Sequence, residues 1–351
     1  AALIAGTVPL LLAFSWAGTQ YAWGSSQIIG LFVVAAVMLT VFYFIERRAT
    51  EPVLNPQLFG NSIFSVSVIA TFLTSIGMFG AIMYLPLFIQ GVIGTSATNS
   101  GAVLTPMMLG FMVSSVVGGQ IMSLTGRYKV LALGGFVVAA IGMFLLTQMT
   151  VNATNGLVVR NMVITGLGIG VMMSLFTIVV QNAFPFRQLG EVTSSLQFFR
   201  SIGGTIGVGI LGSVMTNRFT SSLETNIPDS VRQLIPAGGM STLANPQALF
   251  SPEATGRIRD MFTSMGPQGQ DLFNQFMLAV RESLTTGIVS VFQVSLGVMI
   301  VAFIVTLFLR EIPLRKAYHD EPAEPSNVPG AQPANARGAS ATPVMTPSNE
   351  D

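Results

Sequence analysis

The side chains that carry most protein chemistry are scarce in this 351-residue chain. There is no cysteine, and His319 is the one histidine, so neither a disulfide framework nor a thiolate or histidine-rich metal site can be built. The acidic residues form no clustered constellation of the kind that general acid–base catalysis uses. The sequence therefore predicts no enzyme, no bound metal and no organic cofactor.

Arg200 stands out because it lies well inside an apolar stretch of the chain. If that stretch is a membrane helix, Arg200 lies about eight residues from its end, which is roughly 12 Å at ~1.5 Å per residue. A charge that faces lipid at such a depth costs on the order of 3 kcal/mol, so we expect it to face protein or a watery cavity. Two interpretations stay open. Arg200 is a gate or cavity charge, or it reaches the interface or is held by carbonyls and by Gln197.

The elements that must position Arg200 are long apolar runs. Hydrophobic residues make up 51% of the chain and charged residues 9%, and the mean hydropathy is +0.66, which indicates a membrane protein. A helix of roughly 20 apolar residues crosses the ~30 Å hydrocarbon core of a bilayer. We predict about eight such spans, at 1–15 (truncated), 28–45, 63–89, 101–123, 130–149, 157–181, 192–215 and 286–309. The bilayer is thus the expected partner, and the net charge of +1 gives no reason to expect nucleic acid.

The basic residues of the short connections indicate the orientation of these spans. They are Arg47, Arg48, Arg127, Lys129 and Arg187. All fall on one side, whereas the short loops 91–98 and 150–155 carry no lysine or arginine, so the first side is predicted to be cytoplasmic. We expect a multi-pass protein of the bacterial inner membrane, with the connection 216–283 outside. The tail 311–351 is inside and disordered, because its composition cannot form a core.

The external connection contains helix signals of its own. Asn245-Pro246 and Ser251-Pro252 each place a capping residue before a proline, and Gly266 can end a helix that begins at Pro252. Apolar residues in the connection suggest amphipathic helices on the bundle or at the interface: Met261, Phe262, Phe273, Phe276 and Met277. Both a lid and a simple packed connection fit this pattern.

Glycines recur at close spacing in two of the predicted spans. They are Gly166, Gly168 and Gly170 in one span, and Gly203, Gly204, Gly207, Gly209 and Gly212 in another. Small residues let helix backbones approach closely in membranes. The glycines either pack the bundle statically or provide smooth faces on which one group of helices rocks against another.

A glycine-rich and basic turn joins the spans 101–123 and 130–149. It reads Gly119-Gln-Ile-Met-Ser-Leu-Thr-Gly126-Arg127-Tyr-Lys129. This run resembles the second-half copy of the glycine-aspartate-arginine-glycine loop motif of the major facilitator superfamily. Ser123 stands where that motif has an acid and Leu124 where it has a base, which weakens the expectation of a charge-relay gate here.

Two further stretches resemble the fourteen-helix drug:proton antiporter family of the EmrB/QacA type. They are Glu-Pro-Val-Leu-Asn-Pro-Gln-Leu-Phe at 51–59 and Ser-Ser-Leu-Gln-Phe-Phe-Arg-Ser-Ile-Gly-Gly at 194–204. The resemblance runs from Ala1 to about Leu309. It implies an all-α membrane protein of the major facilitator fold, with two central helices in 1–61 and a C-terminal six-helix domain in 62–310. The N-terminal six-helix half would be missing from the chain.

The resemblance also implies a function, namely export of a small amphipathic organic substrate driven by the proton gradient, without a cofactor. No predicted span has an acid at its middle, so the proton carrier is expected in the missing half. Candidate cavity residues lie on the two helices that line the cavity in this fold: Thr74, Met78, Tyr84, Met172, Met173 and Phe176. Methionine and aromatic side chains adapt to varied apolar ligands, although ordinary packing explains these residues equally well.

Two other functions compete with export. Uptake of a nutrient or metabolite by the same fold is the alternative, although a sugar-type cavity would carry more Asn, Gln and Trp inside its spans. A membrane enzyme or receptor would need a catalytic cluster or a soluble module, and the sequence contains neither.

Overall fold

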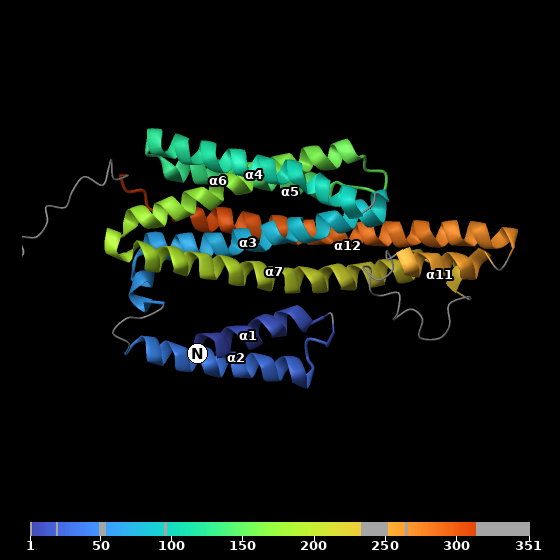
Figure 1. Ribbon diagram of the computed structural model, residues 1–351, viewed down its shortest axis with the longest axis horizontal. Coiled ribbons are helices and arrows are strands. Elements are labelled where there is room, and N and C mark those ends of the chain that lie inside the picture. Colours follow the sequence, from blue (N-terminus) through green and yellow to red (C-terminus); the bar gives the residue numbers. More distant parts are fainter. Residues whose placement is uncertain are drawn as a thin grey trace, which may run out of the picture. The chain divides into compact units, whose positions relative to one another are not determined.

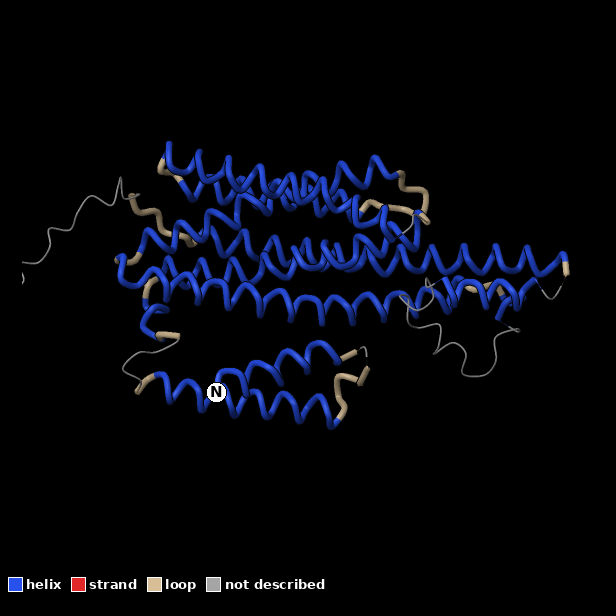
Figure 2. Tube along the Cα trace, viewed as in Figure 1, coloured by secondary structure: helices blue, strands red, loops and turns tan. Residues whose placement is uncertain are grey.

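The computed structural model describes residues 2–18, 20–48, 54–94, 97–232, 252–263 and 266–313, and these are almost entirely helical (Figures 1 and 2). The longer helices are α1 (Ala2–Trp16), α2 (Ser26–Glu46), α3 (Ser62–Phe88), α4 (Ala97–Thr125), α5 (Tyr128–Thr147), α6 (Asn155–Ala183), α7 (Leu189–Asn226), α11 (Pro252–Thr263) and α12 (Pro267–Leu307). Shorter turns of helix lie at Pro56–Gly60, Ile89–Ile93, Phe186–Gln188 and α8 (Asp229–Arg232).

Seven helices among the described residues are long and apolar enough to cross a membrane, which confirms an all-α membrane protein. They correspond to seven of the eight predicted spans, and the eighth is the 15-residue α1. Local sequence fixes several helix starts. The side chains of Ser25 and Asn61 accept hydrogen bonds from the backbone N–H groups of Ile28 and Ile63, at 3.4 and 2.9 Å.

The six long helices from α3 onward, leaving out the shorter α8 and α11, pack in two interleaved groups. Helix α3 packs against α7 and α12, whereas α6 packs against α4 and α5, and α12 joins the groups through α5. Each group thus combines helices from the first three (α3, α4, α5) and the last three (α6, α7, α12). The two halves of the bundle therefore do not pack as separate three-helix units.

The glycines of α6 and α7 lie where neighbouring helices come closest. A Cβ atom added at Gly168 would lie 2.6 Å from the Ala139 Cα of α5, and one at Gly207 would lie 2.8 Å from the Ile76 Cα of α3. Neither gap can hold a methyl group, because real Cβ contacts are longer. The glycine faces therefore pack helices of the same bundle, which supports the packing interpretation at these positions.

The pair α1–α2 contacts the bundle through α7. The indole Nε1–H of Trp23 donates a hydrogen bond of 2.9 Å to the Ser213 hydroxyl. A Cβ at Gly209 would lie 2.6 Å from the carbonyl carbon of Phe14, so α1 and α7 also approach closely here. A half-buried hydrogen bond from the loop after α1, together with a glycine contact, thus fixes how α1 lies on α7.

Within the predicted connection 216–283, the structure continues two of the long helices. Helix α7 runs to Asn226 and α12 begins at Pro267, so they are about 57 and 61 Å long, well beyond the ~30 Å of hydrocarbon. Hydropathy detects only the apolar part of each helix, so it does not reveal the polar part that continues the same helix. The two helices stay in contact, with the Asn226 side-chain amide donating to the Ser283 hydroxyl at 3.3 Å.

Helix α11 packs on the N-terminal part of α12 through aromatic rings. The Phe262 ring of α11 lies 5.9 Å from that of Phe276 and 6.2 Å from that of Phe273, and all three side chains are buried. This confirms helix formation after Ser251-Pro252, with Gly266 at positive φ just before α12. Met261 is exposed, and the Asn245-Pro246 signal lies outside the described residues.

We predict that Gly168→Ala destabilises the purified protein by about 1–3 kcal/mol, because a methyl group forced against α5 overpacks the helix contact. The matched control is Gly156→Ala in the same helix, where an added Cβ meets nothing within 4 Å. The measurement is the midpoint of thermal aggregation in detergent. Equal midpoints for the two variants would show that the α5–α6 contact yields easily.

Candidate functional site

Polar side chains of α6 and α7 form a seam that extends into the apolar region. We call it the polar seam, and its members are Ser174, Thr177, Gln181, Thr193, Gln197 and Arg200. Their spacing of three, four or seven residues places them on one face of each helix. The Gln181 amide donates to the Thr193 hydroxyl at 3.1 Å, which links the two helices directly.

Arg200 is the charged member of the polar seam. Its Nη1 donates to Gln197 Oε1 at 2.8 Å, and its Nη2 lies 3.4 Å from both the Met173 carbonyl oxygen and Thr177 Oγ1. Arg200 lies about 16 Å along the helix from Leu189, so these acceptors offset part of the cost of a charge at depth. The structure thus brings Gln197 and Arg200 together, as the sequence suggested.

The Arg200 guanidinium has no acidic partner among the described residues, and its buried Nε has no hydrogen-bond acceptor there. Gln197 and Ser201, on the same side of α7, are exposed. An unbalanced cation beside an open helix face attracts a group that supplies negative charge or strong acceptors.

The six cavity candidates divide into two sets. Met173 is half-buried, and its carbonyl oxygen faces Arg200. The other five are buried in the bundle: Thr74, Met78, Tyr84, Met172 and Phe176. The Thr74 hydroxyl donates to the Ala70 carbonyl at 2.7 Å, and the Tyr84 hydroxyl to the Val208 carbonyl at 3.4 Å. Contact of these residues with a substrate stays a prediction.

The glycine-rich turn between α4 and α5 is a tight connection. Gly126 adopts a φ of 68°, a left-handed conformation that favours glycine. Arg127 is exposed, and its backbone N–H donates to the Thr125 hydroxyl at 3.4 Å. Gly119 lies on α4, where an added Cβ would reach only the Ile178 side chain, at 3.9 Å.

Tyr128, within this turn, fastens the segment after α12, and the sequence pattern did not predict this role. The buried hydroxyl donates to the Arg310 carbonyl and accepts from the Ile312 N–H, each at 2.6 Å. The Lys129 N–H donates to a Glu311 carboxylate oxygen at 3.3 Å. Residues 311–313 of the predicted tail are therefore held against the bundle, and the disorder predicted for 314–351 lies outside the described residues.

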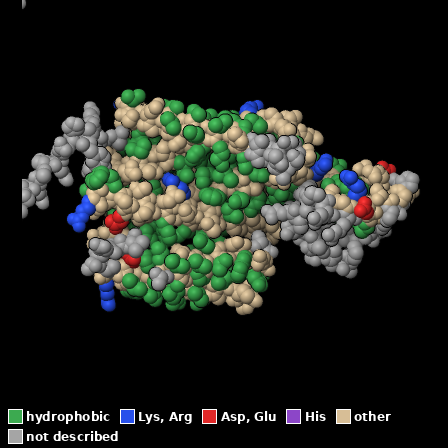
Figure 3. Space-filling view, in the orientation of Figure 1, with side chains coloured by type: hydrophobic (Ala, Val, Ile, Leu, Met, Phe, Trp, Pro, Cys, Tyr) green, Lys and Arg blue, Asp and Glu red, His purple; other side chains and the backbone are tan. Residues whose placement is uncertain are grey.

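A polar crevice of about 560 Å³ lies at the opposite end of the bundle. Arg218 of α7 and Glu282 of α12 both line it, and no ion pair joins them. The sequence pattern placed these residues in a loop, so it could not bring them together. Figure 3 shows that charged side chains gather mainly toward the ends of the helices, whereas hydrophobic side chains cover much of the visible middle. Within the described ranges, no group of His, Cys, Asp and Glu could hold a metal ion.

Comparison with known proteins gives a consistent family match. The sequence profile of the Major Facilitator Superfamily matches residues 1–208. The chain is 39% identical over 324 residues to the multidrug transporter protein MdtP of Bacillus subtilis (strain 168), covering 89% of this chain and 58% of that protein. It is 33% identical over 314 residues to the uncharacterized MFS-type transporter Rv1877 of Mycobacterium tuberculosis (strain ATCC 25618 / H37Rv), covering 90% and 42%.

A third relative matches over most of both chains. The tetracycline resistance determinant of Streptomyces rimosus is 31% identical over 337 residues, which covers 92% of this chain and 94% of that protein. The chain thus spans about half the length of the two relatives above and nearly all of this one.

We predict that Tyr128→Phe frees the segment after α12, since two hydrogen bonds worth about 1 kcal/mol each are lost. A cysteine placed at position 312 of this cysteine-free chain reports the change, and its labelling by a soluble maleimide should accelerate about fivefold or more. Tyr43→Phe, at an exposed tyrosine of α2, is the control. Unchanged labelling in Tyr128→Phe would mean that apolar packing alone holds the segment.

Proposed function

Because the chain belongs to the Major Facilitator Superfamily, whose members are transporters and not enzymes, we propose that it takes part in export of small amphipathic organic compounds. Relatives named as a multidrug transporter and a tetracycline resistance determinant support export over nutrient uptake. The observation that carries the proposal is the polar seam, where Arg200 lies without an acidic partner among the described residues and beside exposed positions of α7.

In this proposal the six-helix bundle is one wall of a central cavity. Substrate sites of such transporters lie near the middle of the membrane between two bundles, which rock against each other to open the site to either side. The open side of the polar seam is the surface that a second six-helix bundle would cover. The α1–α2 pair would then be the central pair of a fourteen-helix EmrB/QacA-type transporter, which places the described bundle C-terminal to it.

The proposal assigns the proton-carrying group to the second bundle. Proton coupling needs an intramembrane group that can titrate, most often Asp, Glu or His. In the described part of the chain, Glu46 lies at the end of α2, Glu191 and Glu224 lie in the first and last turns of α7, and Glu282 lies in the polar first half of α12. None of them lies in the apolar centre of its helix. A carboxylate brought by the second bundle would also supply the negative charge that Arg200 lacks.

We predict that Arg200→Ala and Arg200→Glu, in a transport-competent protein, lower the initial rate of substrate efflux by about tenfold or more. The scale follows from losing charge-assisted hydrogen bonds worth about 1.5–3 kcal/mol. Arg200→Lys should be milder, because it keeps the charge but not the planar donor fork. Membrane levels should fall less than transport.

Arg187→Ala is the matched control for Arg200, because Arg187 is exposed in the turn before α7. It should leave efflux close to that of the parent protein. Efflux by Arg200→Ala equal to that of the parent would reduce Arg200 to a packing role.

A further prediction concerns the second bundle. The 351-residue chain expressed alone should insert but give no drug efflux dependent on the proton gradient, because it supplies one wall and no central titratable group. Co-expression with the part of MdtP that this chain does not match should restore efflux of a fluorescent drug, because the chain covers 58% of that protein. Robust efflux from the chain alone would contradict both the shared cavity and the placement of the proton carrier.

A further inference from the structure

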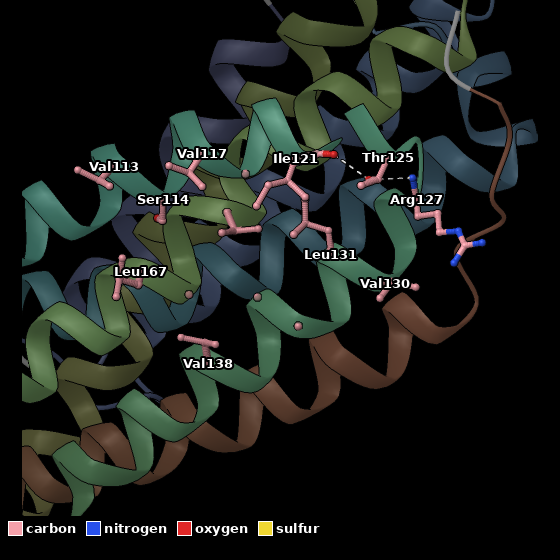
Figure 4. A pocket seen from close by; sticks show the side chains of 15 residues that line it. Val113, Ser114, Val117, Ile121, Thr125, Arg127, Val130, Leu131, Val138 and Leu167 are labelled. Carbon is pink, nitrogen blue, oxygen red and sulfur yellow. Dashed lines mark hydrogen bonds between the residues drawn. The ribbon is translucent and has the colours of Figure 1, made fainter. Parts of the chain in front are cut away.

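A deep apolar groove lies between α4 and α5, away from the polar seam (Figure 4). Both helices pack on α6 but scarcely on each other, so α6 forms the floor of the groove. Its volume is about 610 Å³, and aliphatic side chains line most of it, for example Val117 and Ile121 of α4, Val138 of α5 and Val171 of α6. The proposed export function does not use this groove.

Glycines make the groove deep. Gly118, Gly134, Gly135 and Gly168 all line it, so the helix backbones form part of its walls. A Cβ added at Gly134 would meet nothing within 4 Å, which means that a side chain there would project into open space. Part of the space therefore exists because Gly134 carries no side chain.

One end of the groove carries positive charge. Arg127 is the one charged residue among those that line the groove, and it lies at the turn after α4 (Figure 4). Its exposed guanidinium has no hydrogen-bond acceptor and no ion pair within the described part of the chain. Lys129, a second basic residue, lies two residues later. The acidic residue recorded beside these two cations is Glu311, whose carboxylate accepts a hydrogen bond from the Lys129 backbone N–H.

The length of the groove matches one leaflet of a bilayer. Its lining on α4 runs from Val113 to Thr125, about 18 Å at ~1.5 Å per residue. Half of a ~30 Å hydrocarbon core is about 15 Å. With the α4–α5 turn at the cytoplasmic surface, as the loop charges predict, the groove reaches from that surface to the middle of the bilayer.

We propose that this groove binds an anionic phospholipid of the cytoplasmic leaflet, with one acyl chain between α4 and α5 and the phosphate at Arg127. The apolar walls exclude water and take the chain, and the guanidinium pairs with the phosphate oxygens. Charge complementarity selects this occupant. A cationic drug would be repelled at the mouth, and a zwitterionic lipid gains less because its own ammonium group competes for the phosphate.

The test is native mass spectrometry of the purified 351-residue chain, titrated with phosphatidylglycerol or phosphatidylcholine. The parent should retain one phosphatidylglycerol at concentrations about tenfold lower than phosphatidylcholine. Gly134→Leu fills the groove and should abolish this difference. Gly297→Leu on α12, where an added Cβ also meets nothing within 4 Å, is the matched control and should bind as the parent does.

A second variant keeps the proposal testable if Gly134→Leu folds poorly. Arg127→Gln alters one exposed side chain and should weaken phosphatidylglycerol binding about tenfold while leaving phosphatidylcholine binding unchanged. Equal retention of both lipids by the parent, or tight phosphatidylglycerol binding by a folded Gly134→Leu protein, would overturn the proposal.

The same spectra distinguish the other possible occupants. If the organic cation tetraphenylphosphonium displaces a molecule bound to the parent and phosphatidylglycerol does not, the groove is a substrate portal. If the parent forms a dimer that only Gly134→Leu loses, the groove is an interface between two copies. Either result would contradict lipid binding there.

Discussion

When helices associate inside a bilayer, they gain no hydrophobic free energy, because the lipid that they displace is as apolar as their side chains. The bundle therefore depends on how closely backbones can approach, and here glycines determine that distance. On α6, Gly166 and Gly170 face α4 and Gly168 faces α5. On α7, Gly203 and Gly207 face α3, and each of these contacts is close because the glycine has no side chain. These contacts are made within one bundle. They fix α6 and α7 at the position where the polar side chains of the two helices can meet.

The same packing explains how a charge persists at depth. Arg200 reaches Thr177 and the Met173 carbonyl only because α6 and α7 are held near each other at this level. Those bonds are long, and Gln197 supplies the one short contact, so the guanidinium is accommodated without being neutralised. The cavity role that we propose for Arg200 needs a charge that is stable in the bundle and still able to accept a new partner, and this arrangement is compatible with both needs.

The sequence was most informative where composition acts alone. The apolar runs of α2 to α7 and α12 predicted the spans because hydrocarbon thickness imposes a minimum length on any crossing helix. Hydropathy did not predict that α7 stays helical from Met215 to Asn226, because hydropathy falls where polar residues begin and helix geometry does not. Tyr128 was missed because its partners are backbone groups 182 and 184 residues away, which no local pattern encodes. Substrate contact by the six cavity candidates stays a prediction. Residue type suggested them, whereas their burial depends on the direction that each helix face takes, which no local pattern encodes.

Helix α7 runs without interruption over 38 residues, with Arg200 in its first half and Asn226, which contacts α12, at its far end. Its close glycine contacts, with α3 at Gly203 and Gly207 and with α1 at Gly209, fall near its middle. A stiff rod held at its middle behaves as a lever. In the export mechanism that we propose, a tilt of α7 that moves its Arg200 end moves its far end, which contacts α12 at Ser283, in the opposite direction. In that mechanism one helix couples access on the two sides of the membrane, so that closing one side opens the other.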